Sequence, residues 1–213
     1  MRKLQYLSLG IFLLLAFAVA WLYFLLPEII VTHWNFQGKP DGFMSKEFFS
    51  AFFLSLALGI YGLLLVIPKI DPLRKNIKKF IIYYDGMVVL SAGFMLYIYL
   101  IVAASNIGLG IDTAKAIIPC VSSLLFYVGF LCTKSKRNWF IGIRTPWTLS
   151  SDKVWEKTNR LGGRLLEAYS IVFLLGFFVS QDFFILLLFV LILIFIFTTV
   201  YSYFEYRKEE GYA

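Results

Sequence analysis

The chain alternates long apolar runs with short polar connections. A helix needs about 20 apolar residues to cross a bilayer, and six runs approach that length: Leu4–Leu26, Phe48–Ile67, Phe80–Ala104, Ala116–Thr133, Leu165–Ser180 and Phe183–Phe204. The fifth run is the shortest, so we expect its helix to begin upstream of Arg164, and Gln181-Asp182 alone join it to the sixth. The pattern predicts an all-α integral membrane protein with six transmembrane helices in a single domain, residues 1–213.

Basic residues gather in alternate connections. The N-terminus, the second connection (Lys69–Lys79), the fourth connection (residues 134–164) and the C-terminal tail hold 17 of the 20 lysines and arginines. The other three are Lys39, Lys46 and Lys115. Because cytoplasmic loops carry the excess of Lys and Arg, this distribution predicts that both termini and the fourth connection are cytoplasmic.

Composition agrees with a protein of the bilayer. Hydrophobic residues make up 60% of the chain and charged residues 15%, whereas soluble domains average about 45–50% and about 25%. This composition excludes a soluble enzyme. In a membrane protein the net charge of +7 reflects the topology of the chain. We therefore expect lipid as a partner and no nucleic acid. Cys120 and Cys132 are about 18 Å apart on one helix, too far for a disulfide, so we expect free thiols.

The first connection, residues 27–47, is predicted to be a structured outer loop. Lys39-Pro40-Asp41-Gly42 predicts a sharp turn, because Pro presets φ, Asp bonds nearby backbone and Gly accepts a positive φ. Ser45 is expected to cap the second helix.

The single histidine of the chain, His33, lies in this loop, and three interpretations of it are open. It can form a metal or proton site with Glu28 and Asp41. It can belong to an interfacial loop in which Trp34 and Phe36 anchor in the lipid headgroups. It can also contribute to a binding surface for an extracellular ligand, since function concentrates on loops held by rigid elements.

The fourth connection holds three of the five tryptophans, Trp139, Trp147 and Trp155. Residues 138–148 show no helical period and predict a structured loop. Ser150 or Ser151 then caps a short amphipathic helix, which carries Val154, Trp155, Thr158 and Leu161 on one face and charged residues on the other. We expect this helix to lie on the cytoplasmic surface of the membrane.

Two acidic residues, Asp85 and Glu167, fall inside the third and fifth runs. A carboxylate within the membrane is costly and usually has a function or a partner. Both lie near the predicted cytoplasmic ends, where snorkelling or an ion pair with Lys79 or Arg164 accounts for them. A further hypothesis is that Arg144, among apolar loop neighbours, turns inward and pairs with one of these acids.

The sequence contains no G-x-S-x-G, H-E-x-x-H, C-x-x-C or G-x-x-x-x-G-K-[ST] pattern. We therefore expect no enzymatic activity, no cofactor and no bound metal.

Two segments carry a resemblance to a known family. Pro27 to Asn35, followed by Gly38-Lys39-Pro40-Asp41-Gly42, is similar to one pattern of that family, and Arg137 to Thr148, with Trp155 and Asn159, is similar to another. With six helices and cytoplasmic termini, the chain resembles the SdpI/YfhL family of bacterial integral membrane immunity proteins along its whole length.

The resemblance implies a multi-pass protein of the bacterial plasma membrane that protects its producer from a secreted peptide toxin. Some members also signal by drawing a cytoplasmic winged-helix repressor to the membrane. By position, it implies toxin sensing for His33, Trp34, Asn35, Gly38, Pro40, Asp41 and Gly42. It implies an inner structural or signalling role for Gly142, Arg144, Thr145, Pro146, Trp147, Trp155 and Asn159.

Two other functions compete with immunity. A small transporter or channel exporting a peptide or ion would couple transport to Asp85 or Glu167. A membrane enzyme acting on lipid or cell wall would depend on a metal at His33.

Overall fold

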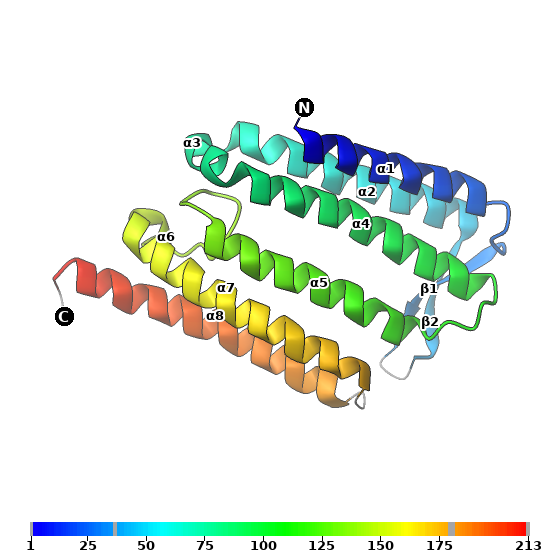
Figure 1. Cartoon of the computed structure of the whole chain (residues 1–213). Coiled ribbons are helices and arrows are strands. Elements are labelled where there is room, and N and C mark those ends of the chain that lie inside the picture. The colour runs from blue at the N-terminus through cyan, green and yellow to red at the C-terminus, as the bar shows by residue number, and fades with distance from the viewer. Residues whose placement is uncertain (1, 36–37, 179–181, 212–213) are drawn as a thin grey trace. The chain divides into compact units, whose positions relative to one another are not determined.

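The structure is a computed structural model that describes residues 2–35, 38–178 and 182–211. It is mostly helical (Figure 1). The helices are α1 (Lys3–Leu22), α2 (Lys46–Ile70), α3 (Arg74–Ile77), η1 (Lys78–Phe80), α4 (Ile81–Asn106), α5 (Thr113–Lys134), α6 (Pro146–Ser150), α7 (Asp152–Leu175), η2 (Gly176–Phe178) and α8 (Asp182–Glu209). Two strands, β1 (Ile29–Trp34) and β2 (Pro40–Ser45), pair as an antiparallel hairpin.

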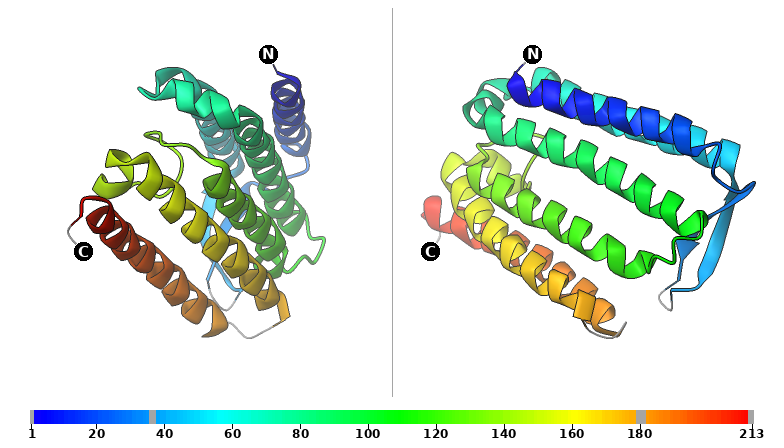
Figure 2. Two further views of the ribbon diagram at one scale, coloured as in Figure 1. Left: turned by 60° about the vertical axis from the view of Figure 1, so that its left-hand side comes forward. Right: turned by 45° about the vertical axis from the view of Figure 1, so that its right-hand side comes forward.

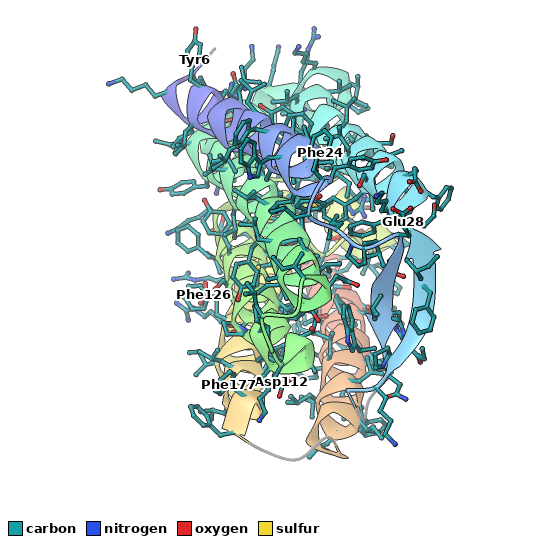
Figure 3. All side chains as sticks on the ribbon, turned by 90° about the vertical axis from the view of Figure 1, so that its right-hand side faces the viewer. Tyr6, Phe24, Glu28, Asp112, Phe126 and Phe177 are labelled. Carbon is teal, nitrogen blue, oxygen red and sulfur yellow. The ribbon has the colours of Figure 1, made fainter. Side chains whose placement is uncertain are left out.

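The six predicted membrane spans are confirmed. Within the described residues, six helical stretches are long and apolar enough to cross a membrane: Lys3–Leu22, Lys46–Ile70, Arg74–Asn106, Thr113–Lys134, Asp152–Phe178 and Ile185–Glu209. Large apolar side chains project outward from these helices, and Figure 3 labels Tyr6, Phe126 and Phe177 among them. Such exposure suits lipid as the surrounding solvent. The predicted cytoplasmic location of the termini stays a prediction.

Three details differ from the sequence-based expectation. The fold is not entirely α-helical, because the first connection contains the hairpin. The first helix ends at Leu22, four residues earlier than its apolar run. The expected amphipathic helix is not a separate element: it forms the first turns of α7, which continues from Asp152 to Leu175. The fifth span therefore does begin upstream of Arg164. Gln181, in the predicted tight connection, lies outside the described residues.

The chain divides into two compact units, whose boundaries fall within α2, α4 and α5. The first unit is Met1–Leu64 with Val88–Val121, and the second is Leu65–Met87 with Ser122–Ala213. The predicted organisation as one domain stays a prediction.

The core of the first unit joins the hairpin to three helices. Ile30 of β1 is fully buried together with Leu15 of α1, and Tyr99 of α4 stacks on Phe49 of α2 at 5.9 Å between ring centroids. The Tyr99 hydroxyl donates to the carbonyl of Val19 at 3.4 Å. The hairpin is thus fixed to the helices by the apolar side of β1.

The second unit is built on α7 and α8, which run antiparallel side by side (Figure 2). Leu166 and Tyr169 of α7 pack with Leu187 of α8. The end of α5 approaches α7 closely, since a Cβ on Gly129 would lie 2.6 Å from the carbonyl oxygen of Gly163. Small residues permit this backbone approach between membrane helices.

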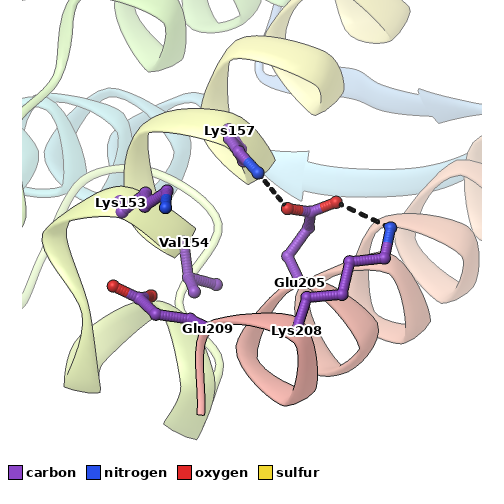
Figure 4. A pocket seen from close by; sticks show the side chains of 6 residues that line it. All are labelled: Lys153, Val154, Lys157, Glu205, Lys208 and Glu209. Carbon is purple, nitrogen blue, oxygen red and sulfur yellow. Dashed lines mark hydrogen bonds and ion pairs between the residues drawn. The ribbon is translucent and has the colours of Figure 1, made fainter. Parts of the chain in front are cut away.

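Figure 4 shows an ion pair between α7 and α8. Glu205 of α8 accepts from Lys157 of α7 at 2.5 Å and from Lys208 of its own helix at 3.4 Å. Glu205 is buried, so the two lysines stabilise a carboxylate that is largely shielded from water.

Candidate functional site

The hairpin, residues 29–45, brings together the motif residues of the first connection. Ile29 pairs with Ser45, Val31 with Phe43, and Trp34 with Pro40, and the register is irregular on both sides of His33. At its base, the Glu28 carboxylate pairs with the Lys46 ammonium at 2.6 Å. The Lys46 amide also donates to the Glu28 carbonyl at 3.0 Å, which closes the hairpin.

The chain reverses between Asn35 and Lys39, not at the predicted Lys39–Gly42 turn. The Asn35 amide donates to the carbonyl of Lys39, and the Asn35 side-chain oxygen accepts from the Lys39 amide at 3.0 Å. Gly38 takes a positive φ of 70°, which glycine tolerates without strain. Pro40 instead begins β2, a position where a missing N–H is acceptable.

His33 and Asp41 form an exposed pair on the hairpin. The imidazole Nδ1 lies 2.5 Å from the Asp41 carboxylate, and their side chains are 71% and 43% exposed. Gly42 faces His33 across the strands, where a Cβ would lie 2.7 Å from the His33 Cβ. Glycine at position 42 therefore permits the close packing of the backbone under His33.

The three residues of the metal interpretation, His33, Glu28 and Asp41, do not come together in this arrangement. Glu28 pairs with Lys46, so it does not join His33 and Asp41. Across the described residues, no group of three or more His, Cys, Asp and Glu side chains lies close enough to hold a metal ion. Trp34 packs half-buried against the apolar core of the first unit, and Phe36 lies outside the described residues.

Asn106 of α4 holds the outer edge of β1, a role that the sequence did not reveal. Its side-chain oxygen accepts from the Val31 amide at 2.8 Å, and its side-chain nitrogen donates to the Val31 carbonyl at 2.9 Å. This amide completes the two hydrogen bonds that a neighbouring strand would otherwise supply. The signal was an amide at the end of an apolar run, which sequence alone does not connect to a distant strand.

The fourth connection is organised by two buried asparagines. The Asn138 side chain accepts from the amides of Phe140 and Ile141 and donates to two carbonyls of the same turn. Asn159 of α7 accepts from the Ile143 amide at 2.7 Å and donates to the Ile143 carbonyl at 3.3 Å. Both side chains are almost fully buried. They fix the loop's backbone, and Asn138 was not among the predicted site residues.

Gly142 and Trp155 complete this packing. Gly142 has a φ of 111°, and a Cβ there would lie 2.5 Å from the Asn159 side-chain oxygen and 3.0 Å from the Trp155 ring. Trp155 is buried and donates from its indole nitrogen to the Ser135 carbonyl at 3.3 Å. These three motif residues therefore form one structural cluster.

Thr145 and Pro146 begin the short helix α6. The Thr145 hydroxyl accepts from the Thr148 amide at 3.1 Å, while the Thr148 hydroxyl accepts from the Thr145 amide at 2.8 Å. This reciprocal cap, with Pro146 in the first turn, is a typical helix start. The Thr145 hydroxyl also lies 2.9 Å from that of Ser202 on α8, and Trp147 packs edge-to-face on Tyr203 at 5.1 Å.

The second connection supports the loop from another side. The Asp71 carboxylate accepts from the Trp139 amide at 2.9 Å and from the Leu73 amide at 2.6 Å. The Asn76 side chain donates to the Arg137 carbonyl at 2.9 Å. Asp71 is buried, and it was missed because its partner is a backbone amide.

The proposed inward ion pair of Arg144 is wrong. Arg144 is exposed, and its guanidinium donates to the Trp139 carbonyl at 2.5 Å. Within residues 2–35, 38–178 and 182–211, Arg144 forms no ion pair with Asp85 or Glu167. Asp85 is buried on α4, whereas Glu167 is half-buried on α7 and lines a cleft beside Cys132. Cys120 and Cys132 are free, as expected.

Within the described residues, six apolar helices define a multi-pass membrane protein. Residues 134–202 match the model of the SdpI/YfhL protein family, and residues 10–59 match a domain of unknown function, DUF1648. The chain is 28% identical over 193 residues to "Immunity protein SdpI" of Bacillus subtilis (strain 168), covering 89% of each chain. No solved structure matches the chain. These matches confirm the resemblance to the SdpI/YfhL family.

Proposed function

We propose that this chain is a membrane immunity protein that protects its producing bacterium from a secreted peptide toxin, without catalysing a reaction. The observation that carries the proposal is the similarity to "Immunity protein SdpI", which extends over 89% of both chains. The matched segments 10–59 and 134–202 include the hairpin and the whole fourth connection.

We assign contact with the toxin to the hairpin. Its His33–Asp41 pair is exposed. The apolar residues Ile29 and Phe43 are also exposed, by 58% and 59%. Asn106 already occupies the outer edge of β1 at Val31, so β2 carries the edge available to an extended peptide. A surface that combines strand edge, apolar side chains and a polar pair suits an amphipathic peptide.

A survival assay in a toxin-sensitive bacterium tests this proposal. Cells that express the chain are exposed to candidate secreted peptides, at matched membrane levels of wild type and variants. Replacing His33 and Asp41 together by alanine should abolish protection. The matched control replaces Asp112 and Lys115, an exposed ion pair at the start of α5 with a separation of 3.5 Å, and should protect fully.

Two outcomes oppose the proposal. No protection by the wild-type chain against any candidate peptide argues against immunity. Full protection by the His33→Ala/Asp41→Ala variant argues against the hairpin as the contact surface while leaving immunity in place.

A second part of the proposal concerns signalling to a cytoplasmic winged-helix repressor. Its support is the exposed surface of the fourth connection, where Trp139 is 50% and Phe140 37% exposed beside Arg144. Replacing Trp139 and Phe140 by alanine should release a fluorescently tagged repressor from the membrane while protection persists. Unchanged membrane localisation of the repressor would remove this surface from the signalling role.

A further inference from the structure

A cleft of about 440 Å³ lies in the second unit, along the end of α5 and the first half of α7. Four basic side chains and two acidic ones line it, a formal net charge of +2. These charged lining residues are Lys134, Lys136, Glu156, Arg160, Arg164 and Glu167. Its volume is within the range of small-molecule sites, about 300–1,000 Å³.

Most of the positive charge in this cleft is not neutralised by the protein. Lys136 pairs with Glu156 at 3.5 Å. In the described part of the chain, neither Arg160 nor Arg164 has a carboxylate oxygen within 4.0 Å of its guanidinium. The Lys134 ammonium lies over the rings of Phe130 and Tyr83, at 5.3 and 5.8 Å, and this contact leaves its charge available to an anion.

The position of the two arginines along α7 indicates the nature of that anion. Arg160 and Arg164 are one turn apart on the same side of α7, which belongs to the membrane span Asp152–Phe178. Arg164 directly precedes the apolar run that begins at Leu165. An arginine at the border of an apolar membrane span is favourable where its guanidinium reaches the phosphate layer or a bound anion.

We propose that this cleft binds the headgroup phosphate of an anionic phospholipid, held by Arg160, Arg164 and Lys134. The planar guanidinium groups bind phosphate oxygens through paired N–H donors, and the lysine adds a point charge. Thr133 and Ser135 line the same cleft, and their hydroxyls donate to backbone carbonyls of α5 at 2.7 and 2.8 Å. Their free lone pairs can accept from headgroup hydroxyls, which favours a glycerol headgroup over choline.

Glu167 limits the charge that the cleft accepts. Its carboxylate lines the cleft without an ion pair among the described residues, and it opposes the two arginines. The single phosphodiester charge of a lipid stays within the net charge of +2, whereas a multiply phosphorylated headgroup exceeds it.

The test uses the full chain purified in dodecylmaltoside. Dioctanoyl-phosphatidylglycerol, dioctanoyl-phosphatidylcholine and inorganic phosphate are titrated separately, and the midpoint of thermal unfolding and the bound lipid in native mass spectra are measured. Phosphatidylglycerol should raise the midpoint and remain bound, because a ligand that binds the folded state stabilises it. Phosphatidylcholine and inorganic phosphate should do neither at the same concentration.

Variants assign the binding to the arginines. Arg160→Gln and Arg164→Gln should each weaken phosphatidylglycerol binding by about tenfold, the loss expected for a charge-assisted hydrogen-bonded pair. The matched control is Lys153→Gln, an exposed cation of α7 outside this cleft, which should bind like wild type. Without lipid, all three variants should unfold at the wild-type temperature, since these arginines make no internal ion pair.

Several outcomes overturn the proposal. Equal binding of phosphatidylglycerol and phosphatidylcholine removes headgroup charge as the determinant. Equal stabilisation by inorganic phosphate assigns the cleft to a soluble anion. Wild-type affinity of Arg164→Gln for phosphatidylglycerol shows that Arg164 does not bind the headgroup. If that variant does not fold, Arg164→Lys replaces it, and an affinity unchanged by losing the planar donor pair contradicts the mode of binding. The readout is lipid binding, so the outcome is independent of toxin protection.

Discussion

The hairpin exposes four of its seven motif residues and buries none, whereas the fourth connection buries three of its seven. His33 is 71% exposed and contacts Asp41, while Trp155 and Asn159 are each 1% exposed and hold the backbone of a neighbouring loop. Residues of the same family patterns therefore serve different purposes. Changes in the hairpin should alter binding with little loss of stability, and changes in the fourth connection should do the reverse.

The largest effect should come from Gly142→Ala. Alanine would have to adopt a φ of 111° with its Cβ 2.5 Å from the Asn159 oxygen, so backbone strain adds to a broken hydrogen bond. The expected loss is on the order of 3 kcal/mol in unfolding free energy, measured by denaturation in detergent. Gly10→Ala is the control, because its Cβ would meet open space on α1. Equal stability of the two variants would contradict this account.

The next largest loss of stability is expected at Asn159, in comparison with Asn35 of the hairpin. Asn159→Ala should cost about 2–3 kcal/mol, because it removes a buried side chain and leaves the Ile143 amide without its acceptor. Asn35→Ala should cost at most about 1 kcal/mol, since its side chain bonds the Lys39 amide in an exposed turn. Denaturation curves of both variants check the difference. A larger loss at Asn35 would reverse the assignment of structural and binding roles.

The sequence was sufficient to predict the membrane spans but not the hairpin. Bilayer thickness fixes the length of a spanning helix, so apolar runs alone locate all six. The strand Ile29–Trp34 is rich in β-branched residues, yet it directly follows an apolar helix and lacks strict alternation. Pro40-Asp41-Gly42 is a strong local turn signal, and the pairing of Trp34 with Pro40 overrides it.

The candidate site was predictable in its residues but not in their partners. The resemblance indicated Asn159 and Gly142, whereas their contact with each other comes from the fold. Asp71, Asn106 and Asn138 were missed because they bond backbone amides or carbonyls, which every residue offers. Such pairings leave no charge or spacing pattern to recognise.

Gly42→Ala should affect binding more than stability. A Cβ at this position would lie 2.7 Å from the His33 Cβ, so the two strands must shift and the His33–Asp41 pair with them. The substitution should lower the unfolding free energy by about 1 kcal/mol, while survival against the toxin should fall markedly. Gly38→Asn is the control within the same hairpin, because asparagine tolerates a positive φ and its Cβ meets open space. If the two variants protect equally, the geometry at His33 is not required.

The smallest effect should come from Arg144→Ala. Its guanidinium is exposed and donates to one backbone carbonyl, that of Trp139, so its removal should cost about 0.5–1 kcal/mol. Breaking a buried ion pair would instead cost about 3–5 kcal/mol. A double-mutant cycle with Asp85→Asn and with Glu167→Gln distinguishes the two cases, because residues without direct contact have additive effects. We expect additivity with both acids and near-wild-type stability for Arg144→Lys, which keeps a donor for the carbonyl. A large loss that neutralising either acid partly restores would show that Arg144 turns inward to a carboxylate and that the fourth connection rests on charge as well as on its asparagines.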